Sequence, residues 1–366
     1  MQSLPVNKGR VSSGRARAAN RQRLRALNIS EQPVVLVGDI GGTNARLAAW
    51  RAGNKGEEIF SKTFPTSKHE TFDEVVEEFL KEPAVAQHTP KAAAFAVAGA
   101  VSNNRCAMTN ISWIVDGPSL SKKLGIKVGI LNDFEAVGYG IPALDDSDIV
   151  PINPVACEAR APKVVMGPGT GLGAAQLMWD EGQGDYRVWP GEGAHASFAP
   201  RGWKQAALNA FVIERFQHCE IEQVACGSGL ELIYEFLQSD EVANRPDLLR
   251  ATNKKSAADI SSSALDKSDH LAVEAVDMFL GIIGAEAGAM ALRCLAKGGV
   301  YIAGGIAPKL MQRIQHGSLL EGFLMRKGRE KFHDILLQTP LFVITNGKVG
   351  QIGACAFATK LLQQVK

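Results

Sequence analysis

The chain has 366 residues, of which 46% are hydrophobic and 21% charged, an ordinary globular composition with enough length for two domains. Its formal net charge of +2 gives no general argument for a nucleic-acid or membrane partner. No apolar run approaches the roughly 18 residues that span a bilayer. The six cysteines form no C-x-x-C pair, which argues against a disulfide framework or a structural zinc site. We therefore expect a soluble intracellular protein with reduced thiols.

The basic residues are concentrated at the N-terminus. Residues 1–30 contain seven Lys and Arg and no Asp or Glu, which leaves 33 basic against 38 acidic residues in the rest of the chain. We expect residues 1–32 to be a disordered extension. An acid-free head with Arg and Ser resembles a plastid or mitochondrial transit peptide. If the segment does not target an organelle, the protein would be cytoplasmic. The alternative interpretations of residues 1–32 are an inert tail and a basic arm that binds nucleic acid.

Ordered structure is expected to begin near Pro33. Residues 70–81 place Phe72, Val75 and Phe79 at helical spacing, with acids on the other face. The expected elements of the first half are strands at 34–39, 46–51, 57–63, 92–98 and 127–131, and helices at 70–81, 117–124 and 134–141.

The second half opens with the same strand-rich pattern and then becomes helical. Residues 269–296 are rich in Gly and Ala, which suits close packing inside a core. The expected elements are strands at 163–167, 173–179, 185–189, 299–303 and 341–345, and helices at 201–217, 228–238, 255–265, 269–296, from Pro308 onwards, and 350–363. Each half therefore alternates a hairpin-rich sheet with helices, which is α/β architecture.

Two short stretches show the same pattern, an apolar run followed by a Gly/Thr turn and a second apolar run. The turns are Gly41-Gly42-Thr43 and Gly169-Thr170-Gly171. Glycine permits positive φ and close approach of the backbone to a ligand, and successive N–H groups form an anion-binding concavity. A strand, not a helix, follows each turn, so neither is a Walker loop or a dinucleotide fingerprint. One such hairpin would be structural more often than not, but two matched copies favour a polyphosphate site.

Six motifs then occur in a fixed order along the chain. They are Asp39-x-Gly41-Gly42-Thr43-x-x-Arg46, Ala107-Met108-Thr109-Asn110-x-x-Trp113, Leu131-Asn132-Asp133-Phe134, Gly169-Thr170-Gly171-Leu172-Gly173, Pro190-Gly191-Glu192-Gly193-x-His195 and Ala303-Gly304-Gly305-Ile306. In these motifs, over residues 33–366, the chain resembles the bacterial-type ATP-dependent glucokinases of the hexokinase/actin-like ATPase superfamily. No cysteine cluster follows His195, which separates the chain from the zinc-bearing repressor/kinase group.

The resemblance implies a duplicated actin-like (ribonuclease H-like) ATPase fold, with two α/β domains and a cleft between them. By this analogy residues 33–143 plus 346–366 form the small domain and 144–345 the large one. Asp133 would accept the proton of the sugar 6-hydroxyl as the catalytic base. The plainer interpretation is that Asp133 only caps the helix that follows it.

The resemblance also assigns the glucose ligands: Asn132, Asp133, Glu192, His195 and Glu222. An amide such as that of Asn132 can both donate to and accept from a diol. Glu222 is the less distinctive assignment, because Glu220 lies close by. Ala194 stands where relatives often have glycine, and its methyl group could narrow the loop.

The nucleotide would be lined by Gly41, Gly42, Thr43, Thr170, Gly171, Gly304 and Gly305. Asp39 would act on Mg²⁺ through water, since magnesium needs only one or two carboxylates besides phosphates and retained waters. A turn-stabilising Asp39 is the alternative. Arg46 fits a phosphate contact and a structural pairing equally well.

The predicted activity is transfer of the γ-phosphate of MgATP to the 6-hydroxyl of D-glucose, giving glucose 6-phosphate and ADP, the first step of glycolysis. Its partners would be glucose and MgATP, with no nucleic acid or membrane, in an enzyme that fits a homodimer. Another hexose or glucosamine remains an alternative phosphate acceptor. Polyphosphate or ADP remains an alternative phosphate donor. A non-catalytic sugar-sensing or chaperone-like ATPase of the same fold is the rival class, and the sugar-binding set argues against it.

Overall fold

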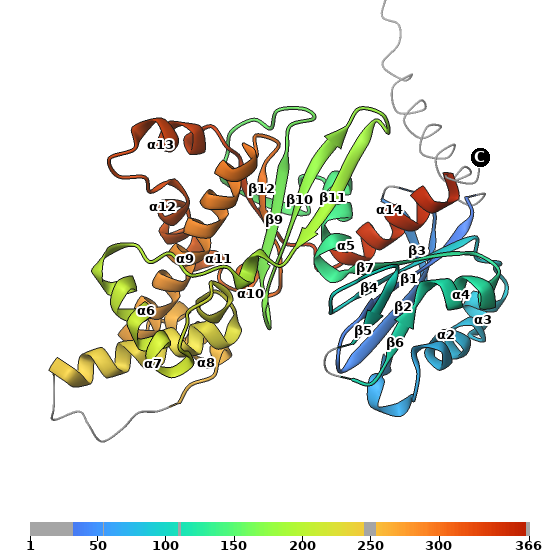
Figure 1. Cartoon of the computed structure of the whole chain (residues 1–366), viewed down its shortest axis with the longest axis horizontal. Helices are drawn as coiled ribbons and strands as arrows, with labels where there is room; N and C mark the ends of the chain where they lie inside the picture. Colours follow the sequence, from blue (N-terminus) through green and yellow to red (C-terminus); the bar gives the residue numbers. More distant parts are fainter. Residues whose placement is uncertain (1–31, 54, 109–110, 245–253, 364–366) are drawn as a thin grey trace, which may run out of the picture.

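The computed structural model describes residues 32–53, 55–108, 111–244 and 254–363, without the side chains of residues 240–244. Two α/β lobes are each built around one sheet, and helices α5 and α14 lie between the sheets (Figure 1). The mixed α/β class expected from the sequence is confirmed. The transit-peptide hypothesis concerns residues 1–32, which lie outside the described residues except for Gln32, as do Thr109 and Asn110 of the second motif.

The sheet of the small lobe has the order β3-β2-β1-β4-β7. The first three strands form an antiparallel meander, and β4 and β7 continue it parallel to β1. The bounds are β1 Val34–Ile40, β2 Asn44–Arg51, β3 Glu57–Pro65, β4 Ala92–Val97 and β7 Lys127–Asn132, with a separate ribbon of β5 Arg105–Ala107 and β6 Ile114–Asp116. All five predicted strands of this half are thus present.

Both faces of this sheet are covered, because successive side chains of β1 point to opposite sides. Leu36 packs in the apolar cluster that includes helix α2, and Val35 packs with helix α14 on the other face. Thr71 accepts a hydrogen bond from the Glu74 N–H, so α2 begins one residue after this cap. The helical elements here are η1 Thr66–Lys68, α2 Phe72–Leu80, α3 Pro83–Ala86, α4 Gly117–Leu124, α5 Asp133–Gly140, η2 Ile141–Ala143 and α14 Val349–Gln363.

The sheet of the large lobe repeats the same topology. Its order is β11-β10-β9-β12-β13-β8: an antiparallel meander, two parallel strands, and one extra antiparallel edge strand. The bounds are β8 Ile149–Asn153, β9 Lys163–Pro168, β10 Leu172–Asp180, β11 Asp185–Gly191, β12 Val300–Ile302 and β13 Leu341–Ile344. The two halves therefore share one plan, as the paired turns predicted.

The helices of the large lobe pack around the long helix α9. Its Gly284 is needed there, since a Cβ at that position would lie 2.0 Å from the backbone oxygen of Leu319 in α12. The elements are η3 Gly193–His195, α6 Gly202–Phe216, η4 Glu222–Val224, α7 Gly227–Asn244, α8 Ala257–Leu265, α9 His270–Cys294, α10 Ile306–Lys309, α11 Met311–Ile314, α12 Ser318–Leu324 and α13 Glu330–Leu337.

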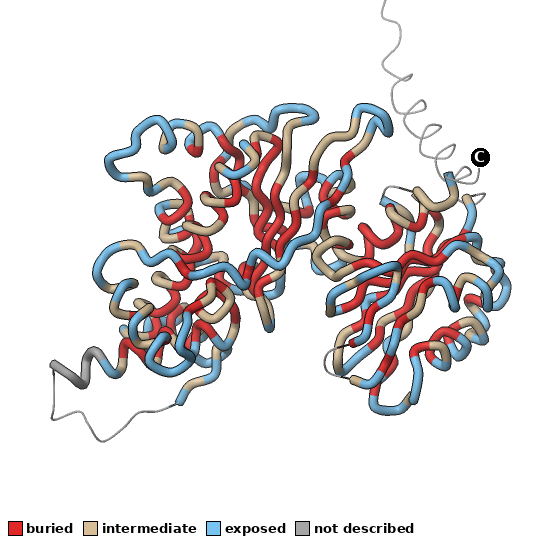
Figure 2. Tube along the Cα trace, viewed as in Figure 1, coloured by how far each residue is buried: buried red, intermediate tan, exposed pale blue. Residues whose placement is uncertain are grey.

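Helix α9 corrects one expectation from composition. By length and hydropathy it could cross a membrane, whereas the sequence was expected to hold no such segment. In its most apolar window 61% is buried inside the protein, and it runs through the red interior of the large lobe (Figure 2). Its apolar character follows from its place in a core.

Other elements also differ from expectation. The short strands β5, β6 and β8 and the helices α3, α12 and α13 were not predicted, because short elements carry little periodicity. Helix α10 begins at Ile306, with Pro308 as its third residue. Pro308 still lies in the first turn, where its missing N–H is tolerated.

Helix α5 fastens the end of the small-lobe sheet to the large lobe. The Phe134 ring fills the space over Gly173, where a Cβ would lie 1.8 Å from it, and also meets Gly167. On its other side α5 packs against α14 so closely that a Cβ on Gly353 would lie 1.7 Å from the Ala136 oxygen. Asp133, at the start of α5, is therefore held by both lobes.

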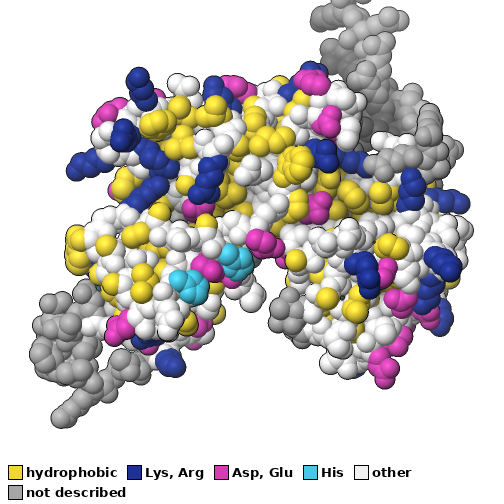
Figure 3. Space-filling view, in the orientation of Figure 1, with side chains coloured by type: hydrophobic (Ala, Val, Ile, Leu, Met, Phe, Trp, Pro, Cys, Tyr) yellow, Lys and Arg dark blue, Asp and Glu magenta, His cyan; other side chains and the backbone are white. Residues whose placement is uncertain are grey.

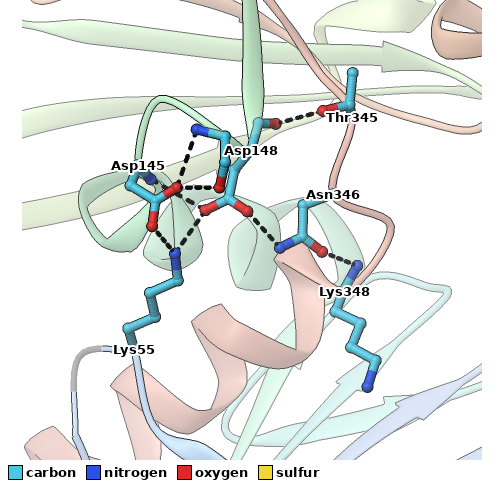
Figure 4. Close-up of polar contacts among 7 residues, drawn as sticks. Lys55, Asp145, Asp148, Thr345, Asn346 and Lys348 are labelled. Atoms are coloured by element: carbon cyan, nitrogen blue, oxygen red, sulfur yellow. Dashed lines mark hydrogen bonds and ion pairs between the residues drawn. The ribbon is translucent and has the colours of Figure 1, made fainter.

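The chain crosses between the lobes twice, and the buried Asp148 joins the two crossings (Figure 4). Its carboxylate accepts hydrogen bonds from Asn346 Nδ2 at 2.9 Å, Lys55 Nζ at 2.9 Å and the Asp145 N–H at 3.0 Å. Its backbone oxygen accepts from the Thr345 N–H at 2.8 Å. These contacts hold the pKa of Asp148 below its ordinary value, against the effect of burial.

Replacing Asp148 by alanine is expected to destabilise the fold by about 2–4 kcal/mol, because three donors lose a buried acceptor. Urea unfolding of both proteins measures the loss. Glu78→Ala is the matched control: Glu78 also pairs with a lysine, but its side chain is 48% exposed, so its removal should cost less than about 1 kcal/mol. Equal losses in the two variants would contradict the role of Asp148.

Candidate active site

Two cavities lie between the lobes. The first, of about 440 Å³, is lined by Asp39 and Asp133 from the small lobe and by Gly304 and Gly305 from the large lobe. The second, of about 470 Å³, is lined by Asn132 and Glu135 on one side and Glu192 on the other. The first cavity therefore brings together Asp39, Asp133, Gly304 and Gly305, and the second brings together Asn132 and Glu192. The other predicted site residues, Gly41, Gly42, Thr43, Thr170, Gly171, His195 and Glu222, line neither of these two cavities.

The capping role considered for Asp133 belongs to Asn132. Asn132 Oδ1 accepts hydrogen bonds from the Phe134 N–H at 2.9 Å and the Glu135 N–H at 3.3 Å, while its Nδ2 donates to the Gly99 oxygen at 3.2 Å. Asp133 Oδ1 accepts from the Phe134 N–H at 2.9 Å. Its own backbone N–H also contributes a hydrogen bond to the carboxylate, and Asp133 lines the first cavity. The interpretation of Asp133 as merely the cap is therefore wrong.

The surroundings of Asp133 make it a stronger base. Burial is the main cause that raises its pKa above the ordinary value, and the charges of Asp39 and Glu192 raise it further, although the Phe134 N–H opposes them. A carboxylate with a raised pKa takes up a proton more readily. Perturbed titration inside a cleft is a common property of catalytic groups.

Asp39 lies at the end of β1, beside the first turn. Its side chain keeps solvent access within the cavity, yet the enclosing protein raises its pKa. Arg46 stands directly opposite Asp39 in the β1–β2 register, and its charge partly offsets that rise. This position supports the structural interpretation of Arg46, which was one of the two left open.

The first turn is held by backbone contacts and by Thr66. The Gly41 N–H donates to the Asn44 oxygen at 2.9 Å, and Thr66 Oγ1 donates to the Gly42 oxygen at 2.7 Å. Gly42 and Thr43 line a neighbouring cavity of about 440 Å³, not the one that holds Asp39. Neither Gly41 nor Gly42 has positive φ, so the positive φ that glycine permits is not used at these two positions.

The Glu222 carboxylate supports the second turn, Gly169-Thr170-Gly171. Its Oε2 accepts a hydrogen bond from the Leu172 N–H at 2.8 Å, and a Cβ on Gly171 would lie 2.5 Å from the same atom. The Gly169 N–H closes the turn onto the Gly171 oxygen at 2.8 Å, leaving Thr170 exposed. Glycine at position 171 allows the Glu222 carboxylate to approach the backbone closely.

Gly304 brings the Ala303-Gly304-Gly305-Ile306 motif against the second turn. It follows β12 with a φ of +84°, and a Cβ there would lie 2.5 Å from the Pro168 oxygen. Gly305, the next residue, has open space where a Cβ would be. Any larger residue at position 304 would push this segment away from the Gly169-Thr170-Gly171 turn. The first cavity stays open beside Gly305.

The Glu192–His195 loop is oriented by a residue that the sequence did not assign. Glu220 Oε2 lies 2.8 Å from His195 Nδ1, and since a carboxylate only accepts, Nδ1 carries the proton. His195 Nε2 lies 4.0 Å from Glu192. The bond to Glu220 raises the pKa of His195, with smaller contributions from the charges of Glu222, Glu220 and Glu192. Histidine and acidic side chains lie side by side on the large lobe where it faces the small one (Figure 3).

Ala194 does not narrow this loop. Its side chain is buried among apolar residues of the large lobe and lines a cavity behind the loop. The methyl group is therefore part of the core.

A duplicated actin-like fold, two glycine turns and a carboxylate-lined cleft between two lobes define an ATP-dependent sugar kinase. The family model described as Glucokinase matches residues 36–361. The chain therefore belongs to the glucokinase family.

Individual relatives agree with this assignment. The chain is 36% identical to a glucokinase of Synechocystis sp. over 350 residues, covering 89% of this chain and 98% of that protein. A glucokinase of Nostoc sp. is 34% identical over 346 residues, covering 90% and 99%. The crystal structure of a glucokinase from an Antarctic psychrotroph has a TM-score of 0.79 at 27% identity, covering 90% and 100%.

A more distant ROK family glucokinase from Streptomyces griseus, solved with glucose and AMPPNP, has a TM-score of 0.58 at 17% identity. It covers 89% of this chain and 99% of its own, and it shares the fold.

Proposed function

We propose that the enzyme transfers the γ-phosphate of MgATP to the 6-hydroxyl of D-glucose, with Asp133 as the base. The observation that carries the proposal is that Asp133 and Asp39 line one cavity with the Gly304-Gly305 turn. A group positioned there accepts the hydroxyl proton while the turns hold the phosphates, and positioning does most of the work in phosphoryl transfer. The Streptomyces relative bound glucose and an ATP analogue, which agrees with both substrates.

Purified protein tests this function directly. We expect glucose 6-phosphate to form only when glucose and ATP are both present. Panels of other hexoses, glucosamine, ADP and polyphosphate define acceptor and donor. Nucleotide hydrolysis that does not respond to any sugar would overturn the proposal.

The proposed sugar site joins Asn132 and Asp133 of the small lobe to Glu192, His195 and Glu222 of the large lobe. Asn132 caps α5 through Oδ1, and its Nδ2 donates one hydrogen to the Gly99 oxygen, which leaves the second Nδ2 hydrogen for a sugar hydroxyl. Glu222 Oε2 is engaged by the Leu172 N–H, which leaves Oε1 for the ligand. Closure of the cleft would bring the two halves of the site onto the sugar and exclude water.

His195→Ala is expected to raise KM for glucose about tenfold with a smaller change in kcat, because a binding contact is removed and the base stays. Steady-state kinetics with saturating ATP measure it. His218→Ala is the control, since His218 also contacts Glu220, at 3.3 Å, on the side away from His195. An unchanged KM in His195→Ala would argue against the ligand role.

The proposed nucleotide site is lined by Gly41, Gly42, Thr43, Thr170, Gly171, Gly304 and Gly305, with Asp39 toward the metal. A solvent-accessible carboxylate without a described donor suits Mg²⁺ held by one carboxylate, waters and phosphates. The magnesium of MgATP neutralises charge on the phosphates. Asp39→Asn should keep the size of the side chain, raise the Mg²⁺ concentration needed for half-maximal rate, and lower turnover. A magnesium titration at fixed ATP tests this, and an unchanged titration would contradict it.

We further propose the expected domain boundaries, with residues 33–143 plus 346–366 in the small domain and 144–345 in the large one. These boundaries agree with the packing of α14 on the small-lobe sheet.

We propose that the basic segment of residues 1–32 targets an organelle. Comparing the localisation of a tagged full chain with that of a tagged chain that starts at Ser30 tests this. A homodimer is proposed as the oligomeric state, and light scattering in solution measures it.

A further inference from the structure

Helix α6 turns an apolar stripe toward solvent. Its inner face packs as that of an amphipathic helix should, with Leu208 and Val212 buried in the core of the large lobe. The opposite face carries an exposed stripe that consists of Trp203, Ala206, Ala210 and Ile213. Trp203 is 73% exposed and Ile213 41%. A contiguous exposed apolar patch marks a surface that another molecule covers.

The position of the stripe is fixed by the segments on either side of α6. The Phe198 N–H donates to the Cys219 oxygen at 2.8 Å, and the Ile221 N–H donates to the Ala196 oxygen at 2.9 Å. The chain before α6 is therefore paired with the chain after it. The helix lies at the periphery of the large lobe, away from the small lobe (Figure 1). The stripe is thus a fixed part of the outer surface that the proposed reaction does not use.

The spacing along the stripe is symmetric. Its members are three, four and three residues apart, so the order of intervals is the same from either end. Alternation of three and four is the spacing by which two helices pack their side chains into each other. A two-fold axis at the level of Leu208 would place Trp203 against Ile213 of a second copy. Ala206 would meet Ala210 of that copy, and such small side chains let two helices approach closely.

The charges of α6 favour the antiparallel orientation. The first turn of α6 has no side-chain cap, so its backbone N–H groups and the helix dipole favour a negative charge at that end. In an antiparallel pair the exposed Glu214 of one copy lies level with Gly202, the first residue of α6, in the other. In a parallel pair both Glu214 side chains would lie together at the negative ends of the two dipoles.

We propose that the outer face of α6 is the interface between two copies of this chain, packed antiparallel about a two-fold axis. The inference rests on the proposed homodimer and assigns its surface. The stripe is self-complementary in shape and in charge, as a two-fold interface requires. An exposed tryptophan at such a centre is the residue type that most often dominates the binding energy.

The size of the patch predicts a dimer that exchanges in solution. One buried tryptophan contributes about 150–250 Å², whereas a standard interface buries about 800 Å² on each copy. Phe216, 48% exposed, and Met325, 43% exposed, enlarge the patch. Met325 lies beside the start of α6, because Arg201 Nη1 donates to its backbone oxygen at 3.3 Å. We therefore expect a Kd on the order of micromolar.

The first experiment is sedimentation velocity of wild type, Trp203→Ala and Ile114→Glu, each from about 1 to 100 μM, which brackets a micromolar Kd. Wild type should shift from monomer to dimer across this range. Trp203→Ala should raise the Kd about 10³-fold, because each copy loses a contact worth about 30-fold. Ile114 is the control, since it is 55% exposed but lies on β6 of the small lobe, and Ile114→Glu should dimerise as wild type does.

Cross-linking tests the orientation of the pair. Ala206→Cys and Ala210→Cys are prepared separately with different tags, both with Cys157→Ser because Cys157 is an exposed native thiol. Air oxidation of the mixture should join one variant to the other, since contacting residues on facing helices come within the roughly 4.4–6.8 Å between Cα atoms that a disulfide spans. Adding Trp203→Ala to both should abolish this product.

The outcomes separate the interface from the other proposals. A wild type that stays monomeric at the highest concentration would overturn the interface and the homodimer together. A dimer that Trp203→Ala does not weaken, or that forms no mixed disulfide, would overturn this interface and leave the homodimer. Glucose phosphorylation is measured in the same preparations, and kcat of Trp203→Ala should stay within about twofold of wild type because the substituted side chain is exposed. A wild type that dimerises but phosphorylates no sugar would overturn only the proposed reaction.

Discussion

Replacing Asp133 by asparagine should lower kcat by about 10²–10⁴-fold, the range expected for loss of a general base. The variant should nevertheless be at least as stable as the wild type. Because folding raises the pKa of Asp133, its ionised form is less favourable in the folded than in the unfolded protein at neutral pH, and a neutral amide removes that penalty. Steady-state kinetics and thermal unfolding measure the two effects.

The expected changes in kcat and in stability differ, and this difference distinguishes loss of the base from damage to the fold. A damaged fold would lower both, whereas loss of the base lowers only the rate. Glu181→Gln, a carboxyl with 75% exposure far from the cleft, should change neither. The rate of the wild type should fall as pH falls through the raised pKa of Asp133, since the base must be ionised. A variant that keeps more than about a tenth of wild-type kcat would show that the base lies elsewhere.

Gly353→Ala should destabilise the protein by about 3 kcal/mol or more, at the upper end of the range for overpacking. The added methyl group would lie 1.7 Å from the Ala136 oxygen and 2.6 Å from the Gly140 nitrogen, which are backbone atoms of α5. Neither atom can rotate away, so α14 must separate from α5. Because α5 begins with Asp133, we expect activity to fall as well.

Gly350→Ala is the matched control in the same helix. A Cβ there meets only Val137 Cγ2, at an ordinary 3.8 Å, and alanine favours a helix over glycine by up to about 1 kcal/mol. Urea unfolding should show the control as unchanged or more stable. Similar losses in both variants would mean that α14 tolerates no substitution, whatever the contact with α5.

The fold was largely predictable because its strands are long, apolar and bounded by glycine turns. The run at 34–37 is apolar throughout, which suits β1, a strand buried on both faces. The elements that were not predicted lack these features. β5 and β6 have three residues each, so their pairing depends on a register that no local pattern encodes. Most of the apolar window of helix α9 is buried, which made a helix easy to predict and its resemblance to a membrane span easy to miss.

The site was predictable as a set of residues but not as a set of contacts. Asn132 and Asp133 are adjacent, and only the geometry shows which of them caps α5. Glu222 meets the backbone of Leu172, 50 residues away, and Glu220 meets His195 from 25 residues away. The one signal for Glu220 was its closeness in sequence to Glu222.

The contact of Phe134 with Gly173 limits how glucokinases can be recombined. The first segment of the proposed small domain ends at residue 143, but the Phe134 ring within it occupies space that only a glycine in the large-lobe sheet leaves free. A chimera that joins residues 33–143 of this chain to the large domain of a relative would need glycine at the positions of both Gly167 and Gly173. Alanine at these positions in the relative would displace α5 and move Asp133 out of the cavity that it shares with Asp39 and Gly304. Shuffled libraries should therefore select these two glycines together with the aromatic residue.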